Sequence, residues 1–118
     1  MLDLRFNRTP LVADPAKHSG YHEMVKRAQE TGGEMAGWYV PNPDPQATML
    51  GEAQWAWLSW QLQQPADLRI LVSSVQLAAE GTGWEGWSNF PHDRQRLLAH
   101  GAFGGFSKIC DLLQGEAL

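Results

Sequence analysis

The residues of this chain that could do chemistry fall in three short segments of the sequence. Near its start, Asp3 and Arg5 set a carboxylate and a guanidinium two positions apart. Ser74 and Gln76 bring a hydroxyl and an amide to the end of an apolar run, and a loop rich in Gly and Trp follows them. The candidate ligand-contacting residues are Asp3, Arg5, Ser74, Gln76, Trp84, Trp87, Asn89 and His92. We expect these side chains to shape a substrate pocket where the fold brings the segments together.

Each segment also has a purely structural interpretation, and both interpretations stay open at the level of sequence. Asp3 and Arg5 could form a salt bridge or cap a turn. The segment rich in Gly and Trp, residues 78–90, which we call the Trp-rich loop, could pack on the core. Gln76 offers a metal only a neutral oxygen. A serine nucleophile at Ser74 is not expected, because no His and Asp accompany it in a recognised triad pattern. Arg94 and Arg96 could contact phosphate or form solvated ion pairs.

Histidine and cysteine give no metal site that the sequence alone identifies. We interpret His18, His22 and His100 as surface residues. Cys110 is the only cysteine, so an internal disulfide or a cysteine-based zinc site cannot form. No catalytic residue and no metal ligand is therefore assigned within this chain.

Composition indicates one folded unit and excludes some partners. The 118 residues suit a single domain, and 43% apolar content with six Trp argues against disorder. The net charge of −4 comes with no Lys/Arg cluster, so nucleic acid is not an expected partner. No apolar run reaches the length of a membrane span and no signal-like segment is visible, which predicts a cytoplasmic chain as written.

Periodicity predicts three helices, over residues 21–30, 50–63 and 92–99. Thr48 is the expected N-cap of the second helix, whose broad apolar band predicts packing on more than one side. In the third helix Pro91 suits the first turn and Gly101 the end. Alternating prolines predict a loop over residues 40–46, and the glycines of residues 78–90 predict another.

One buried strand is the strongest β signal in the sequence. The run LRILVSSVQL, residues 68–77, is β-branched and apolar, as in a central strand covered on both faces. Residues 1–6 could add an edge strand. The predicted class is α/β: a partial α/β layer with a few helices, one central strand and long loops. Two strands make no stable sheet, so part of the sheet is expected to be missing.

Four blocks of the sequence resemble, in order and rough spacing, consecutive blocks of the PhoD-like phosphatase family, also called alkaline phosphatase D, of the metallophosphoesterase superfamily. The blocks are LDLR at residues 2–5, ATMLGEAQWAWL at 47–58, ADLRILVSSVQ at 66–76 and GWEGWSNFPHDRQRLL at 83–98. The resemblance covers roughly residues 1–100 and leaves residues 17–37 without any likeness. It divides the chain into a partial phosphatase domain, residues 1–100, and a divergent tail, residues 101–118.

The resemblance implies a four-layer α/β/β/α metallophosphoesterase core and hydrolysis of phosphate mono- or diesters. Two metal ions, such as calcium and iron, would activate the attacking water. Asp3, Arg5 and the Trp-rich loop would then lie toward the catalytic end of the sheet. Members of the family are often exported to the periplasm or the cell surface.

The family's metal ligands come mainly from motifs of the types GDxxYAD, WDDHD and GDRH, which this sequence lacks. The leading hypothesis is thus a C-terminal fragment of a phosphatase that is inactive alone. Two alternatives stay open. The chain could be a Trp-rich binding or interaction module, or it could be one part of a split phosphatase that joins the missing remainder of the domain.

Overall fold

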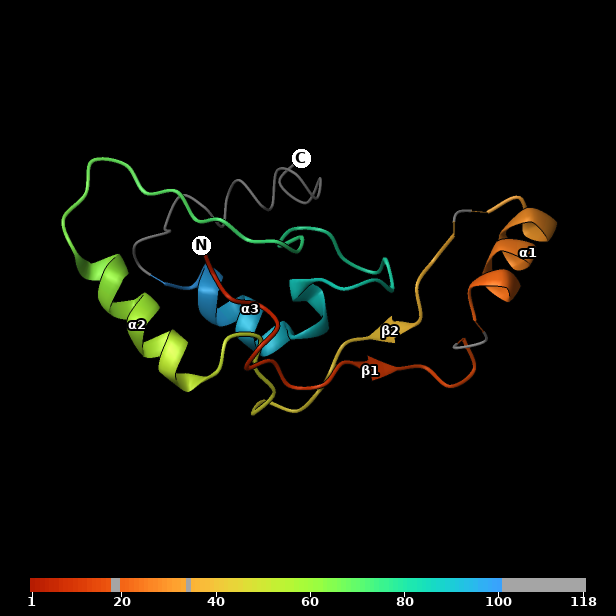
Figure 1. Ribbon diagram of the computed structural model, residues 1–118, viewed down its shortest axis with the longest axis horizontal. Coiled ribbons are helices and arrows are strands. Elements are labelled where there is room, and N and C mark those ends of the chain that lie inside the picture. Colours follow the sequence, from red (N-terminus) through yellow and green to blue (C-terminus); the bar gives the residue numbers. More distant parts are fainter. Residues whose placement is uncertain (18–19, 34, 101–118) are drawn as a thin grey trace.

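The computed structural model describes residues 1–17, 20–33 and 35–100, which form a mixed α/β structure with three α-helices and a two-stranded antiparallel sheet (Figure 1). The predicted tail, the helix stop at Gly101, and Cys110 lie outside the described residues, as does His18. The mixed helix and strand content agrees with the coarse α/β expectation. The metallophosphoesterase layering remains a prediction.

Helix α2, Glu52–Gln63, begins two residues later than predicted and ends where predicted. Its N-cap is Gly51, whose φ of 79° lies in the left-handed region that favours glycine. Thr48 was the wrong cap, yet its hydroxyl accepts a hydrogen bond from the Gly51 N–H at 3.0 Å. The threonine therefore stabilises the turn before the helix and not the first turn itself.

The packing of α2 also differs from the prediction. Trp55, Leu58 and Leu62 are buried on one side, whereas Trp57 and Trp60 are exposed. Although its apolar residues form a broad band, α2 therefore buries only one side. Two of its three indoles face solvent within the described structure.

Helices α1 and α3 follow the sequence prediction closely. Helix α1, Tyr21–Thr31, ends at Gly32 in the left-handed conformation. Helix α3, Pro91–Leu98, carries its proline in the first turn and Asp93 near its N-terminus, and the short 3-10 helix η1, Trp87–Asn89, leads into it. Proline supplies a preset φ and lacks only a donor that the first turn leaves unpaired, so it starts a helix well.

The sheet is not the predicted one. Strands β1, Val12–Ala13, and β2, Tyr39–Val40, pair antiparallel, with Val12 opposite Val40. Both lie in segments without a strand prediction, between α1 and the rest of the molecule (Figure 1).

The prediction of a central strand over residues 68–77, buried on both faces, was wrong. Leu68 and Ile70 are 77% and 79% exposed, and the segment joins no named strand. The predicted edge strand over residues 1–6 is likewise absent as a strand, although the Leu2 N–H donates to the Val72 carbonyl at 3.2 Å. Among the described residues, no element covers the outer face of this apolar run. Its hydrophobicity alone was therefore not enough to place it in a sheet.

A single apolar core joins the beginning, middle and end of the described chain. Its buried members are Leu2, Leu4, Ala47, Met49, Leu50, Trp55, Leu58, Leu62, Trp87, Phe90 and Leu97. Leu71 and Val75 pack against this core from the inner side of the segment predicted as a strand. Helix α1 buries only Met24 and lies at the far end of the molecule from α2 (Figure 1).

Two glycines, Gly37 and Gly83, let two backbone segments cross in close contact. The Gly37 N–H donates to the Thr82 carbonyl at 2.9 Å, and the Tyr39 N–H donates to the Gly83 carbonyl at 2.8 Å. A Cβ built on Gly37 would overlap the Gly83 carbonyl, and one on Gly83 would overlap the Gly37 carbonyl. The segment before β2 can therefore cross the Trp-rich loop only where both residues lack a side chain.

Replacing Gly37 with alanine is expected to separate these two segments and to lower the free energy of unfolding by about 2 kcal/mol, as other overpacked sites do. Urea denaturation followed by tryptophan fluorescence measures the change. Gly33→Ala is the matched control, because its Cβ would meet only the Thr31 hydroxyl at an ordinary 3.4 Å. Equal stability of the two variants would contradict the crossing.

Candidate functional site

The N-terminal segment and the Trp-rich loop meet at an ion cluster of Arg5, Arg8 and Glu85. One oxygen of Glu85, Oε2, lies 3.1 Å from Arg5 Nη2 and 3.3 Å from Arg8 Nη1. The Arg8 side chain is 15% exposed, whereas that of Arg5 is mostly in solvent. Two guanidiniums sharing one carboxylate leave a local positive charge, which suits an anionic ligand and also suits a structural clamp.

Asp3 stands beside this cluster without pairing to it. Its Oδ1 accepts the backbone N–H groups of Arg5 at 3.0 Å and Phe6 at 3.1 Å, which closes a turn. Its backbone exchanges two hydrogen bonds with the Gln54 side chain on α2, at 2.8 and 2.7 Å. The structure thus gives Asp3 the capping role and Arg5 the salt bridge that the sequence left open beside a ligand role.

Hydrogen bonds to the charged form lower the pKa of Asp3. The backbone N–H of Arg5 contributes most and that of Phe6 next, against a smaller opposing effect of desolvation. A carboxyl whose folded pKa lies below its usual 3.8 stabilises the fold above that pH. That contribution is lost as the pH falls through the lowered value.

Asp3→Asn should therefore remove a part of the stability that the native chain loses on acidification below about pH 4. Carboxyl titration by NMR should give Asp3 a pKa below its usual value, and the acid limb of the stability curve should flatten in the variant. Asp44→Asn is the control, since that carboxylate also caps a turn in an exposed loop. An Asp3 pKa at or above the usual value would refute the assigned bonds.

The Trp-rich loop supplies one partly buried indole, Trp84, and one fully buried indole, Trp87. The Trp84 ring meets the Trp38 ring edge to face, with centroids 5.5 Å apart. Trp87 is buried, its Nε1–H donates to Ser73 Oγ at 3.0 Å, and its ring lies edge-on to Trp55 at 6.5 Å. Trp38 was not among the predicted residues, because nothing local in the sequence connects it to a loop 46 positions later.

The remaining candidates divide between the core and the surface. Asn89 is buried, and its side-chain amide donates to the Trp84 carbonyl at 2.9 Å. Ser74 and Gln76 have exposed side chains, while the Gln76 carbonyl accepts the Trp87 N–H at 3.0 Å. His92 Nε2 lies 3.3 Å from the Pro43 carbonyl. None of the three pockets described for this fold is lined by any of the eight predicted residues, and their role in binding a substrate stays a prediction.

A buried polar cluster surrounds Asp93, which the sequence marked only as a helix-dipole partner. Its Oδ2 accepts hydrogen bonds from Thr48 Oγ1 at 2.8 Å, the Met49 N–H at 2.6 Å and Trp55 Nε1 at 3.0 Å. Asp93 is only 6% exposed. All three donors lie more than 35 positions away in the chain, so no local signal could have revealed the cluster.

Arginines of α3 complete this region. Arg96 stands over the Trp55 ring, 4.4 Å from its centroid, and pairs with Glu52 at 3.1 Å. Arg94 donates to the Leu77 carbonyl at 2.8 Å and pairs with Glu80 at 2.8 Å. The Arg96 pair is solvated, as the ion-pair interpretation predicted, whereas the Arg94 side chain is mostly buried and its pair is not.

Removing the Asp93 carboxylate should be the most damaging single polar change in the described structure. In Asp93→Ala three donors lose their partner, two of them at buried positions, which is expected to cost about 3 kcal/mol or more. Asp93→Asn keeps one acceptor oxygen and should cost less. Urea unfolding followed by the near-ultraviolet circular dichroism of the aromatic side chains reports both.

Asp44→Ala is the control for that series, since its carboxylate caps a turn in an exposed loop. It should cost no more than about 1 kcal/mol. A loss at Asp93→Ala as small as that of the control would contradict the assigned role of Asp93.

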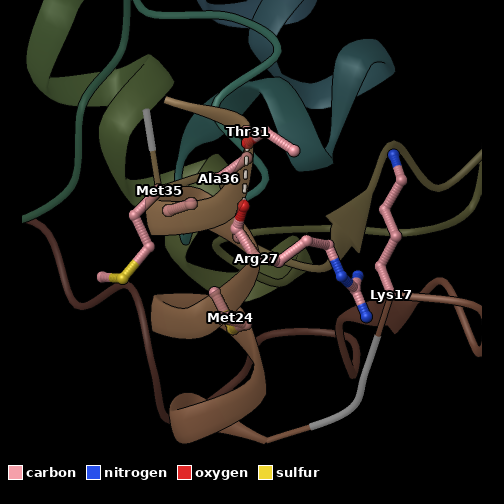
Figure 2. Close-up of a pocket in the computed structure, with 8 residues that line it drawn as sticks. Lys17, Met24, Arg27, Thr31, Met35 and Ala36 are labelled. Carbon is pink, nitrogen blue, oxygen red and sulfur yellow. Dashed lines mark hydrogen bonds between the residues drawn. The ribbon is translucent and has the colours of Figure 1, made fainter. Parts of the chain in front are cut away.

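Two open pockets border α1 and α2, and a third, about 350 Å³, lies beside α3 and includes Arg94. The first, about 250 Å³, lies between α1 and the segment before β2 (Figure 2). Met24 and Met35 give it an apolar wall, and Arg27 and Lys17 stand at its edge, Lys17 also within 3.9 Å of Asp14. The second, about 300 Å³, lies between α2 and residues 65–72 and includes Trp57 and Ile70.

The acidic and histidine side chains of the described residues lie apart from one another. Within residues 1–17, 20–33 and 35–100, no three His, Cys, Asp or Glu side chains lie close enough together to hold a metal ion. The described residues therefore do not fit the two-metal centre that the resemblance implies. Among the same residues, no helix has both the length and the apolarity to cross a membrane.

Comparison of the chain with protein-family models, with curated proteins and with solved structures finds no match.

Proposed function

We propose that this chain is a portion of a PhoD-like metallophosphoesterase domain that contributes scaffold to a phosphate ester hydrolase and does not hydrolyse such esters by itself. The observation that carries the proposal is the convergence of the four sequence blocks. Segments that resemble the family in order and spacing also meet in one core, which is expected of blocks inherited from one domain.

Each block supplies apolar side chains to that core. Leu2 and Leu4 come from the first, Trp55 and Leu58 from the second. The third and fourth blocks add Leu71, Val75, Trp87, Phe90 and Leu97. By contrast, the segment without resemblance, residues 17–37, forms α1 at the edge of the molecule (Figure 1). A variable insertion on a shared core has this arrangement.

Specific polar contacts also join the blocks in pairs. Asp93 of the fourth block accepts from Trp55 of the second at 3.0 Å, and Trp87 donates to Ser73 of the third at 3.0 Å. Glu85 pairs with Arg5 of the first block at 3.1 Å. A chance likeness in four separate stretches would not require those stretches to carry complementary donors and acceptors.

The alternative of a Trp-rich binding module draws less support from the geometry. Of the loop's two indoles, Trp87 is buried and Trp84 packs against Trp38. Indoles held in this way stabilise the loop and offer a ligand little free ring surface.

The proposal of inactivity is supported by the donor set of the described residues. Phosphate ester hydrolysis of this type needs several ligands that hold paired cations, and the described residues have no such group. The ligands would have to come from further sequence carrying motifs like WDDHD and GDRH, in the same polypeptide or in another. We derive no catalytic step for this chain.

Purified chain is expected to release no p-nitrophenol from p-nitrophenyl phosphate or its bis ester above a metal-only blank, with calcium, iron or manganese added. Metal-dependent turnover that persists through a second purification and falls in Arg5→Ala would refute inactivity.

Ancestry is tested separately from activity. Coding sequence on either side of this frame should encode the missing ligand motifs, and co-expression of that polypeptide should restore metal-dependent hydrolysis. Flanks that encode unrelated proteins, with no hydrolysis on co-expression with a family donor segment, would reject the proposal.

A further inference from the structure

The pocket between α1 and the segment before β2, about 250 Å³ in volume, is lined by one stripe of the helix and by the chain that follows it (Figure 2). Helix α1 contributes Met24, Arg27, Ala28 and Thr31, at positions i, i+3, i+4 and i+7, which lie on one face of a helix. Met35 comes from the chain after the helix. The pocket therefore presents side chains of different chemistry within a small space.

Two methionines form the apolar part of the lining. Met24 is the buried residue of α1, and Met35 is 38% exposed. Methionine side chains are flexible and polarizable, so they adapt to a guest, and their sulfur atoms make favourable contacts with aromatic rings. An aromatic body therefore suits this part of the pocket better than a sugar or another polar body.

The charged part of the lining is cationic. Figure 2 shows the side chains of Arg27 and Lys17 on one side of the pocket and Met35 on the other. None of the eight described residues that line the pocket is acidic. A guanidinium carries several N–H donors, so it can bind a carboxylate through two of them while it keeps other contacts. The pocket thus offers a place for a negative charge beside its apolar part.

The size of the pocket and the hydroxyl of Thr31 narrow the class of guest. The volume lies just below the roughly 300–1,000 Å³ of most ligand pockets, which limits the guest to a small molecule. The Thr31 hydroxyl donates to the Arg27 carbonyl at 2.8 Å, so its proton is already used within the helix. The cationic side chains are therefore the donors on which recognition of the guest depends.

We propose that this pocket binds a small aromatic carboxylate, with the ring against Met24 and Met35 and the carboxylate at Arg27. Lys17 adds positive potential at the same edge of the pocket. The site is independent of the proposed phosphatase ancestry, because all of its lining residues lie within residues 17–37, outside the four blocks.

The probe is hydrocinnamate, a phenyl ring on a short carboxylate chain, titrated into the full chain with isotope-labelled methionine methyl groups. The NMR signals of Met24 and Met35 should shift together and saturate with a Kd on the order of 1 mM, as suits so small a ligand. Met49, 1% exposed in the core, should not respond. Met1 lines the pocket beside α2, so a response of Met1 in place of Met24 and Met35 would overturn the proposal.

The charge contact is tested with a neutral ligand and a pair of variants. Hydrocinnamamide, which has the same shape and no charge, should bind about tenfold more weakly than hydrocinnamate. Arg27→Gln should weaken binding of hydrocinnamate about fivefold and leave that of the amide unchanged. Lys26→Gln is the matched control, because it removes the same charge from the same helix at a position outside the lining.

The cavity itself is tested at Ala28. Ala28→Leu should fill the space and abolish the saturable shifts, whereas Gln29→Leu, outside the lining, should preserve them. Leucine is a good helix former, so circular dichroism should show the same helix content in both variants.

Four results would overturn the proposal. They are unmoved Met24 and Met35 signals, equal affinity for acid and amide, equal effects of Arg27→Gln and Lys26→Gln, and unchanged binding by Ala28→Leu. None of these outcomes bears on the hydrolysis of phosphate esters.

Discussion

The described fold depends above all on one buried carboxylate. Asp93 Oδ2 accepts from a threonine hydroxyl, a backbone N–H and an indole, all contributed by the turn before α2 and by α2 itself. A buried anion is tolerated only when donors surround it, so α3 can pack in this position only where α2 begins in this way. Arg96 over the Trp55 ring and its pair with Glu52 reinforce the same contact between the two helices.

Around that contact, segments distant in sequence are held by a few specific constraints. The crossing at Gly37 and Gly83 ties β2 to the Trp-rich loop, and Glu85 ties the loop to Arg5 and Arg8. Trp87 then fills the core with its N–H bonded to Ser73. Most of the side chains that suggested a binding site are engaged in these contacts, because a buried indole or a paired guanidinium already has its partner.

The proposed function rests on two observations: the four blocks share one core, and the described residues contain no cluster of metal-ligand side chains. Four stretches that resemble one phosphatase family pack together, while the acidic and histidine side chains of the described residues stay dispersed. A scaffold of this kind would hold the geometry of a larger site without supplying its metal ligands. The uncovered face along residues 68–72 fits a chain that evolved beside further layers of structure.

By itself, the sequence determined the three helices, since Pro91 at a first turn, Gly32 after a last turn and the apolar spacing of residues 50–63 act over a few positions. It also determined the coarse α/β class. Only the tertiary structure decided the rest. The apolar run at residues 68–77 could become a buried strand only where neighbouring strands and a second layer cover it, and the described residues provide neither. Asp93, Arg8 and Trp38 gained their roles from partners dozens of positions away, which no local pattern encodes. Local backbone preferences are written in adjacent residues, whereas burial and pairing depend on what the whole chain brings together.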